Sequence, residues 1–300
     1  AAHYRVLLDL LGPNTLLSMK LADLHLKNRS FDKAVDVLSQ ARGSDPNNIF
    51  VLEALAQAYV LNKEIPKAIG TYETLSELQE SDYLVFVRIG SLSLQSGNYD
   101  KALNAFKKAD HLGAPNGAEI QRSIGFALNQ LKRNGEAATY YEKAVRMNPK
   151  DIISMSLLAP IYQEMNWLDK SDSIFDKILT LDPENDLILN NYSYSLAERR
   201  IKLDKALGMV QRALAKAPNN SHYLDTLGWI YFQLNQYTLA MKYVKQSFDL
   251  DESSWEVANH LGDIHAKLKN FSDAKAYWQK ALKINSDNET IKRKLYDLSK

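Results

Sequence analysis

Histidine and aspartate side chains between residues 222 and 265 are the groups of this chain best suited to chemistry. His260, Asp263 and His265 lie three and two residues apart, and His222 and Asp225 form a similar pair about one helical turn apart. Imidazole and carboxylate groups at such spacings can bind zinc. A metal site is therefore the first hypothesis for this segment.

Other catalytic patterns are missing from the sequence. The 300 residues include no cysteine, which excludes disulfides, thiolate metal sites and a cysteine nucleophile. No glycine-rich phosphate loop occurs, and the scattered Ser, His and Asp residues lack the elbow motif of a catalytic triad. We therefore predict that the protein is not an enzyme and uses no cofactor.

The charge of the chain is balanced. Lys and Arg number 37 against 36 Asp and Glu, which argues against a general binder of nucleic acid or of anionic membranes. No apolar run approaches the roughly 20 residues needed to span a bilayer. The chain begins at Ala1 without Met, so the compartment stays open: we expect a soluble protein, either cytoplasmic, or periplasmic or exported after removal of a leader.

The elements that must position these residues repeat along the chain. Pro46, Pro149, Pro183 and Pro218 are separated by 103, 34 and 35 residues, close to multiples of 34. Small residues recur at the eighth and twentieth positions of each period, and large aromatic residues recur three or four positions later. Such pairs let two helices approach closely and interlock. On this period the eight units span residues 15–48, 49–82, 83–117, 118–151, 152–185, 186–220, 221–254 and 255–288.

Each unit contains two runs of apolar residues at helical spacing, and nothing in the sequence indicates a strand. Asp45-Pro46 and Asn148-Pro149 end second helices, because proline cannot continue the preceding helix. The sixth unit carries an extra residue near 199–201, which we expect to lengthen the turn between its helices. The pattern predicts an all-α fold.

The signature residues resemble those of tetratricopeptide repeats. Gly228, Tyr231 and Ala240 in the seventh unit, and Gly262 and Trp278 in the eighth, match the small and aromatic positions of this family. The resemblance covers residues 15–288, and the runs 189–200 and 224–237 are similar to repeats in long bacterial arrays. It implies an all-α, right-handed superhelical solenoid of helix-turn-helix repeats, with at least sixteen antiparallel helices after Thr15.

Both ends of the chain continue the pattern. Residues 1–14 are predicted as a helix of a partial preceding repeat, since Tyr4 and Leu7 fall in phase with a second helix. Residues 289–300 are predicted as a C-terminal capping helix. In that helix we expect Ile291, Leu295 and Leu298 to face the array and Lys292, Arg293 and Lys294 to face solvent.

The resemblance also implies where a partner binds, because the second, fifth, sixth, ninth, twelfth and thirteenth positions of each first helix line the concave face in this family. In the first three units these positions hold a mixed, charged surface that includes Lys20, Glu53 and Arg88. In units six to eight they hold amides, aromatics and histidines. The predicted partner-binding residues are Asn190, Asn191, Tyr194, His222, Asp225, Thr226, Trp229, Phe232, Asn259, His260 and Asp263.

This set is typical of a peptide groove, because amides can bond a partner's backbone and aromatic rings supply rigid apolar area. The alternatives are that Trp229 and Phe232 pack against neighbouring helices and that the asparagines form a solvated face. His265 stands where the family usually carries a core tyrosine, so a core role is favoured over a metal site. We predict no metal.

Some family members hold a peptide's terminal carboxylate with Lys and Asn in one unit, Asn in the next, and Lys and Arg in the third. The best window here offers Asn190 and Tyr194, then Thr226, then Glu256 and His260, which lacks the cations and adds an acid. The sequence therefore favours a neutral or basic partner segment over an acidic tail.

These observations leave one favoured function and two alternatives. The favoured one is a non-catalytic protein–protein interaction scaffold that binds a peptide segment or partner protein in its concave groove. The alternatives are an assembly module that self-associates or docks on a larger, membrane-associated complex, and a regulatory arm of an enzyme whose catalytic region lies outside these residues. A large exposed apolar patch would favour assembly.

Overall fold

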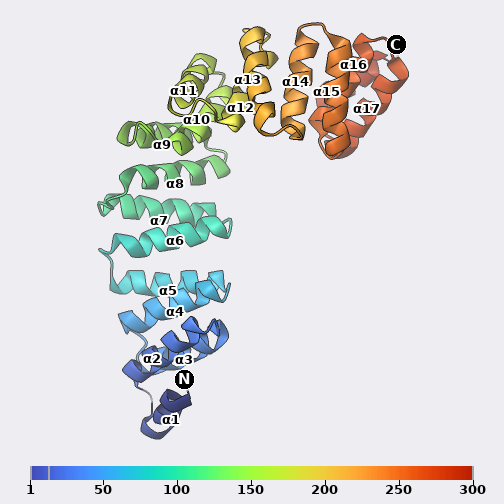
Figure 1. Cartoon of the computed structure of the whole chain (residues 1–300). Coiled ribbons are helices and arrows are strands. Elements are labelled where there is room, and N and C mark those ends of the chain that lie inside the picture. Colours follow the sequence, from blue (N-terminus) through green and yellow to red (C-terminus); the bar gives the residue numbers. More distant parts are fainter. Residues whose placement is uncertain (1, 13, 299–300) are drawn as a thin grey trace. The chain divides into compact units, whose positions relative to one another are not determined.

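The computed structural model is built of helices alone (Figure 1). It describes residues 2–12 and 14–298, and this part of the chain forms eighteen α-helices and no strand. Seventeen of these helices follow from Thr15 onward. The predicted all-α fold is confirmed.

The helices form two compact units, Ala1–Trp167 and Leu168–Lys300, named here the N-terminal unit and the C-terminal unit. The boundary falls between the two helices of the fifth predicted repeat. The N-terminal unit contains α1 (Ala2–Leu11), α2 (Thr15–Lys27), α3 (Phe31–Ser44), α4 (Ile49–Leu61), α5 (Ile65–Leu78), α6 (Tyr83–Gln95), α7 (Tyr99–His111), α8 (Gly117–Gln130), α9 (Asn134–Met147) and α10 (Ile152–Glu164). The C-terminal unit contains α11 (Leu168–Leu181), α12 (Asp186–Glu198), α13 (Leu203–Lys216), α14 (Ser221–Gln233), α15 (Tyr237–Leu250), α16 (Trp255–Lys267), α17 (Phe271–Ile284) and α18 (Glu289–Leu298).

First helices begin at or within one residue of the predicted starts of the units, from Thr15 to Trp255. The helix expected over residues 1–14 is α1, with residues 1 and 13 outside the described part. The cap expected over residues 289–300 is α18, with residues 299–300 outside it. The division into eight repeats itself stays a prediction.

Polar caps set the start of most first helices. The Asn48 Oδ1 accepts a hydrogen bond from the backbone N of Val51 at 3.2 Å, and the Asn220 Oδ1 accepts one from Tyr223 N at 3.3 Å. Such caps satisfy a backbone donor that the helix leaves unpaired. The same role is played by Asn14, Asp82, Asp151, Asn185 and Ser254. Because each cap stands just before its repeat, groove-facing side chains recur in one register.

The two helices of a repeat are joined by a tight turn with one left-handed residue, such as Lys63 (φ 61°), Gly97 (φ 74°) or Asn235 (φ 61°). In the sixth repeat the turn runs over residues 199–202, and both Arg200 and Lys202 have positive φ. The other turns of this kind have three residues, so the predicted lengthening is confirmed.

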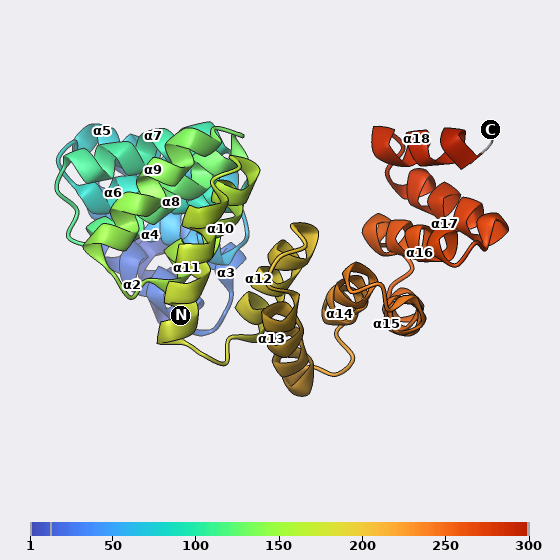
Figure 2. The ribbon, with the colours of Figure 1, turned by 90° about the horizontal axis from the view of Figure 1, so that it is seen from above.

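Helix pairs close through small residues, as predicted. Gly90 faces the ring of Phe106, and a Cβ on Gly228 would lie 2.4 Å from Val244 Cγ2 and 3.1 Å from the Ala240 carbonyl oxygen. These contacts leave no room for a side chain, and the facing aromatic and aliphatic groups are buried. In Figures 1 and 2 the helices of the N-terminal unit follow one another as stacked, antiparallel pairs.

Candidate partner-binding site

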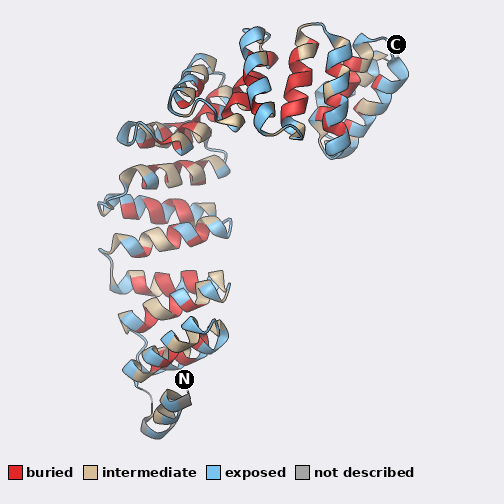
Figure 3. Cartoon of the chain, in the orientation of Figure 1, coloured by how far each residue is buried: buried red, intermediate tan, exposed pale blue. Residues whose placement is uncertain are grey.

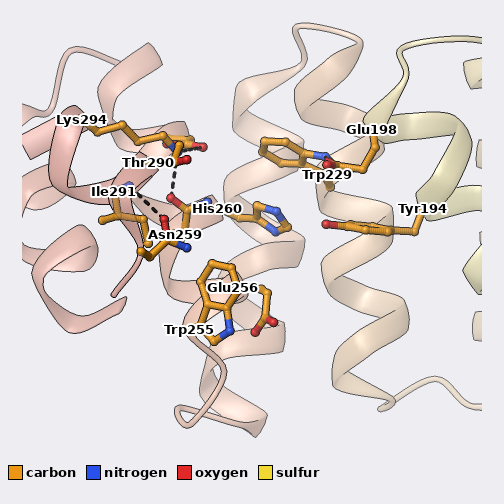
Figure 4. Close-up of a pocket in the computed structure, with 12 residues that line it drawn as sticks. Tyr194, Glu198, Trp229, Trp255, Glu256, Asn259, His260, Thr290, Ile291 and Lys294 are labelled. Carbon is orange, nitrogen blue, oxygen red and sulfur yellow. Dashed lines mark hydrogen bonds and ion pairs between the residues drawn. The ribbon is translucent and has the colours of Figure 1, made fainter. Parts of the chain in front are cut away.

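A pocket of about 300 Å³ opens in the C-terminal unit among α12, α14, α16 and α18 (Figure 4). The first three are the first helices of successive repeats, so the groove-facing register predicted for them brings their side chains together. The pocket is lined by Tyr194, Glu198, Trp229, Trp255, Glu256, Asn259, His260, Asp263, Asn288, Thr290, Ile291 and Lys294. Of the predicted partner-binding residues, Tyr194, Trp229, Asn259, His260 and Asp263 line it.

Trp229 is the centre of an aromatic stack. Its ring lies 4.6 Å from that of Phe232 at an interplanar angle of 5°, and 4.0 Å from that of His260 at 15°. Its Nε1 donates a hydrogen bond to Glu198 Oε1 at 2.5 Å, and the residue is 8% exposed. These contacts agree with the alternative that Trp229 and Phe232 pack against neighbouring helices. Little of the Trp229 indole surface is therefore accessible to a ligand.

His260 is buried beside a carboxylate from the preceding first helix. Its Nδ1 lies 2.9 Å from Asp225 Oδ1 and 3.1 Å from Oδ2, and both side chains are almost fully buried. Burial alone would lower the pKa of His260, but Asp225, with Asp263 and Glu198 nearby, raises it above 6.5. The pair is a fixed, polar link between α14 and α16.

The metal hypothesis finds no geometry to support it. His222 is exposed, and His265 stacks on Tyr277 with ring centroids 5.3 Å apart, which suits the predicted core role. Burial lowers the pKa of His265. Across residues 2–12 and 14–298, no three His, Cys, Asp or Glu side chains are grouped to hold an ion.

The prediction that Lys294 faces solvent is wrong. Its side chain is 26% exposed, and its Nζ lies 2.6 Å and 2.7 Å from the two carboxylate oxygens of Asp263 and 2.8 Å from Asn259 Oδ1. The helical pattern of α18 identified its apolar face, with Ile291 buried, but it did not include the acid one repeat earlier. Lys292 and Arg293 are exposed, as expected.

The remaining predicted residues lie apart from the pocket lining. Asn190 is buried and its Nδ2 donates to Asn191 Oδ1 at 3.3 Å, while Thr226 is buried within α14. Asp225 bonds His260, and its charge also acts on Tyr194. The predicted set therefore divides into the five pocket-lining residues, the buried Asn190, Asp225, Thr226 and Phe232, the half-buried Asn191 and the exposed His222.

Sequence reasoning missed Glu198, Trp255, Asn288 and Thr290. Glu198 holds the thirteenth position of its repeat, which the family resemblance already placed on the concave face. Glu256, at the second position, entered the sequence analysis only as an acid that argues against binding of a peptide's terminal carboxylate. Both acids could therefore have been found from the register alone.

The pocket carries a surplus of negative charge. Asp263 is paired with Lys294 and Asp225 with His260, whereas within the described part of the chain no ion pair engages Glu198 or Glu256. Burial, followed by the nearby carboxylates of Glu198, Asp225 and Glu256, raises the pKa of Tyr194.

The N-terminal unit presents a different surface. Leu16, Phe50, Leu84 and Ile153 occupy the second position of their first helices and are all exposed, Phe50 by 72%. The charged surface expected here contains Arg88, which bonds Tyr72 Oη at 3.0 Å and lies 3.4 Å from Glu53. Large apolar groups are thus left uncovered on four of the five first helices.

Family models match most of the chain. Models described as "Tetratricopeptide repeat" match residues 19–82, 87–152 and 154–185. A model described as "Anaphase-promoting complex, cyclosome, subunit 3" matches residues 199–281.

Individual relatives are distant. The chain is 24% identical to mouse (Mus musculus) tetratricopeptide repeat protein 21A over 96% of its length, and it spans only 21% of that relative. Among solved structures, it resembles a tetratricopeptide repeat protein from Parabacteroides merdae with a TM-score of 0.67 and 16% identity, over 84% of this chain and 99% of that one. It also resembles YrrB, described as a TPR protein with an unusual peptide-binding site, with a TM-score of 0.53 and 21% identity, over 62% of this chain and 95% of that one. These likenesses confirm the solenoid fold.

Within the described part of the chain, no helix combines the length and apolar character needed to cross a membrane.

Proposed function

Because the chain belongs to the tetratricopeptide repeat family, whose arrays typically serve as non-catalytic protein–protein interaction scaffolds, we propose that it binds a segment of a partner protein in the pocket of its C-terminal unit. The protein itself contributes no catalytic step. The segment is neutral or basic, in keeping with the unpaired acids of the pocket.

The observation that carries this proposal is the convergence of five predicted residues on one pocket. They come from three successive first helices, and they combine a half-buried aromatic ring at Tyr194 with the Asn259 amide and charged groups. A concave site with rigid aromatic area and a few fixed polar groups is the usual design of a binding pocket. The stack of Trp229 on His260 holds the walls in place before a partner arrives, which lowers the entropy lost on binding.

The test is selection of random linear peptides from a display library by the full chain. Wild type is expected to enrich peptides that Tyr194→Ala does not retain. Tyr99→Ala is the matched control, because Tyr99 is also a half-buried helix tyrosine but lies in the N-terminal unit. Failure to enrich any peptide, or equal retention by the Tyr194 variant, would overturn the proposal.

A second candidate, self-association, is favoured by the apolar residues at the second position in the N-terminal unit. Exposed apolar groups on successive helices are a common mark of an interface. Sedimentation velocity would test it: an assembly that Phe50→Glu with Leu84→Glu dissociates supports this candidate, and a wild-type monomer at high concentration removes it.

A further inference from the structure

The carboxylates in and around the C-terminal pocket differ in whether the chain itself supplies a positively charged or histidine partner. Three carboxylates, those of Glu198, Glu256 and Asp263, line the pocket, with Glu198 and Glu256 exposed, and a fourth, that of Asp225, is buried against His260. Two have cationic or histidine partners within the chain, and two have none among the described residues. From this imbalance we infer that the pocket receives a lysine or arginine side chain of the partner segment, between Glu198 and Glu256. The inference rests on the proposed function above.

Glu198 is held ready for such a side chain. The indole Nε1 of Trp229 donates to one of its carboxylate oxygens, Oε1, at 2.5 Å. A carboxylate can accept about four hydrogen bonds, so a single indole donor leaves acceptors for an incoming ammonium or guanidinium group. Since Trp229 is itself fixed by Phe232 and His260, the orientation of Glu198 is set before binding.

Aromatic rings complete the environment for a cation. The faces of Trp229 are largely taken by its stacking partners, so that ring orients Glu198 and does not receive the ligand. Trp255 is half-buried, and no aromatic ring stacks on it in the described part of the chain. Figure 4 shows its indole beside Glu256 on the pocket wall. A cation over an indole face gains energy from the ring quadrupole, and more when water is excluded.

The same pocket already binds one lysine in this way. Lys294 Nζ meets the Asp263 carboxylate and the Asn259 amide oxygen, and it lies 5.7 Å from the centre of the Trp278 ring. Acid, amide and indole together hold an ammonium group on the α18 side of the pocket. Glu198, Glu256 and Trp255 offer carboxylates and an indole, without the amide, and among the described residues no ion pair engages either acid.

The experiment continues the peptide selection with the full chain. Wild type is expected to enrich peptides that share a Lys or Arg at one position. Calorimetry with one such peptide then compares it with the same peptide carrying norleucine at that position, and a loss of affinity of about tenfold or more is expected. The affinity of the basic peptide should also fall as salt rises.

The protein side of the test is the double variant Glu198→Gln with Glu256→Gln. Glutamine keeps an oxygen that can accept from the Trp229 indole, so the fold is preserved while the charge is lost. Binding of the basic peptide should weaken about tenfold or more, with the norleucine peptide hardly affected. Glu77→Gln with Glu80→Gln is the matched control, because both are exposed glutamates of the N-terminal unit. It should bind as wild type does.

The outcomes separate the two proposals. Peptides that need Tyr194 but share no basic residue, or that bind the double glutamine variant as well as wild type, would overturn this inference and leave the proposed function standing. If no peptide is enriched at all, the proposed function fails and this inference falls with it.

Discussion

The N-terminal and C-terminal units repeat the same packing but present different surfaces to a partner. At the second position of the first helices, the N-terminal unit exposes Leu16, Phe50 and Leu84, whereas the last two repeats of the C-terminal unit carry His222 and Glu256. Leu187 is the apolar exception in the C-terminal unit. Packing fixes the size of the residue at each position that faces a neighbouring helix, whereas the residues at groove positions can differ between repeats. The 34-residue period alone therefore does not locate the site.

Burial of first helices sharpens this contrast. In α4 Gln57, at the ninth position of its unit, is exposed, while in α14 Asp225, Thr226 and Trp229 are all buried. Figure 3 shows α14 coloured mostly as buried and α4 in a mixture of colours. The concave face of α14 is covered by side chains of its neighbours, His260 among them. In the C-terminal unit, residues at groove positions therefore contribute to the packing of the fold.

Truncation of a groove aromatic should show the largest difference between the units. Trp229→Ala is expected to lower the free energy of unfolding by about 3–5 kcal/mol, because a buried indole and its hydrogen bond to Glu198 are lost. Phe50→Ala, at an exposed position in the N-terminal unit, should change it by less than about 0.5 kcal/mol. Urea titrations followed by circular dichroism measure both, and equal losses would break the comparison.

Glycine-to-alanine changes form the next pair. Gly228→Ala should cost about 1–3 kcal/mol of folding free energy, since the new Cβ would press on Val244 and on backbone atoms. A Cβ added to Gly70, in α5, would meet no group within 4 Å beyond its chain neighbours and the nearby backbone of its own helix, so Gly70→Ala should gain about 0.5–1 kcal/mol. Thermal melts of both variants test this, and a stabilising Gly228→Ala would contradict the tight helix contact.

The buried histidine predicts a pH dependence for the C-terminal unit. The pKa of His260 is raised in the folded protein, so its contribution to stability is present below about 6.5 and is lost as pH rises through the folded pKa. Unfolding titrations on either side of neutrality should show the decline in wild type and a much smaller one in Asp225→Asn. A wild-type stability that rises over this range would refute the assignment.

Ion pairs give the smallest expected effects. Asp263→Asn should cost about 1 kcal/mol, because it removes a half-buried partner of Lys294. Asp23→Asn, which breaks the exposed pair with Lys27 in the N-terminal unit, should cost no more than about 0.5 kcal/mol. Chemical denaturation at low and high salt measures the loss of unfolding free energy in each variant. A larger loss for Asp23→Asn than for Asp263→Asn would mean that burial does not determine how much these ion pairs stabilise the fold.

The fold could be predicted because its causes are local and repeat. Gly228 packs opposite Val244, and Asn220 caps the start of α14. Residues of similar type recur at the same positions of other repeats, so these local causes leave a periodic pattern in the sequence. The position in the repeat also identified five residues that line the pocket, because that position sets the direction in which a side chain points from its helix.

The chemistry of the pocket could not be predicted in the same way, because it depends on contacts between repeats. Position nine identifies the face on which Trp229 lies, but not that Phe232 and His260 enclose it. Lys294 was assigned to solvent because an amphipathic pattern records only which face is apolar. The acid that draws it inward, Asp263, lies 31 residues away in the chain.

The contact between Lys294 and Asp263 has a practical consequence for mapping experiments. A fragment that stops before α18 loses the cation that neutralises Asp263, together with the buried side chain of Ile291. Its pocket would be more acidic than that of the longer chain, so a basic peptide would score as a better ligand on the fragment. Affinity measured on shortened versions therefore reports the truncation as much as the site, and boundaries for such work belong after residue 298.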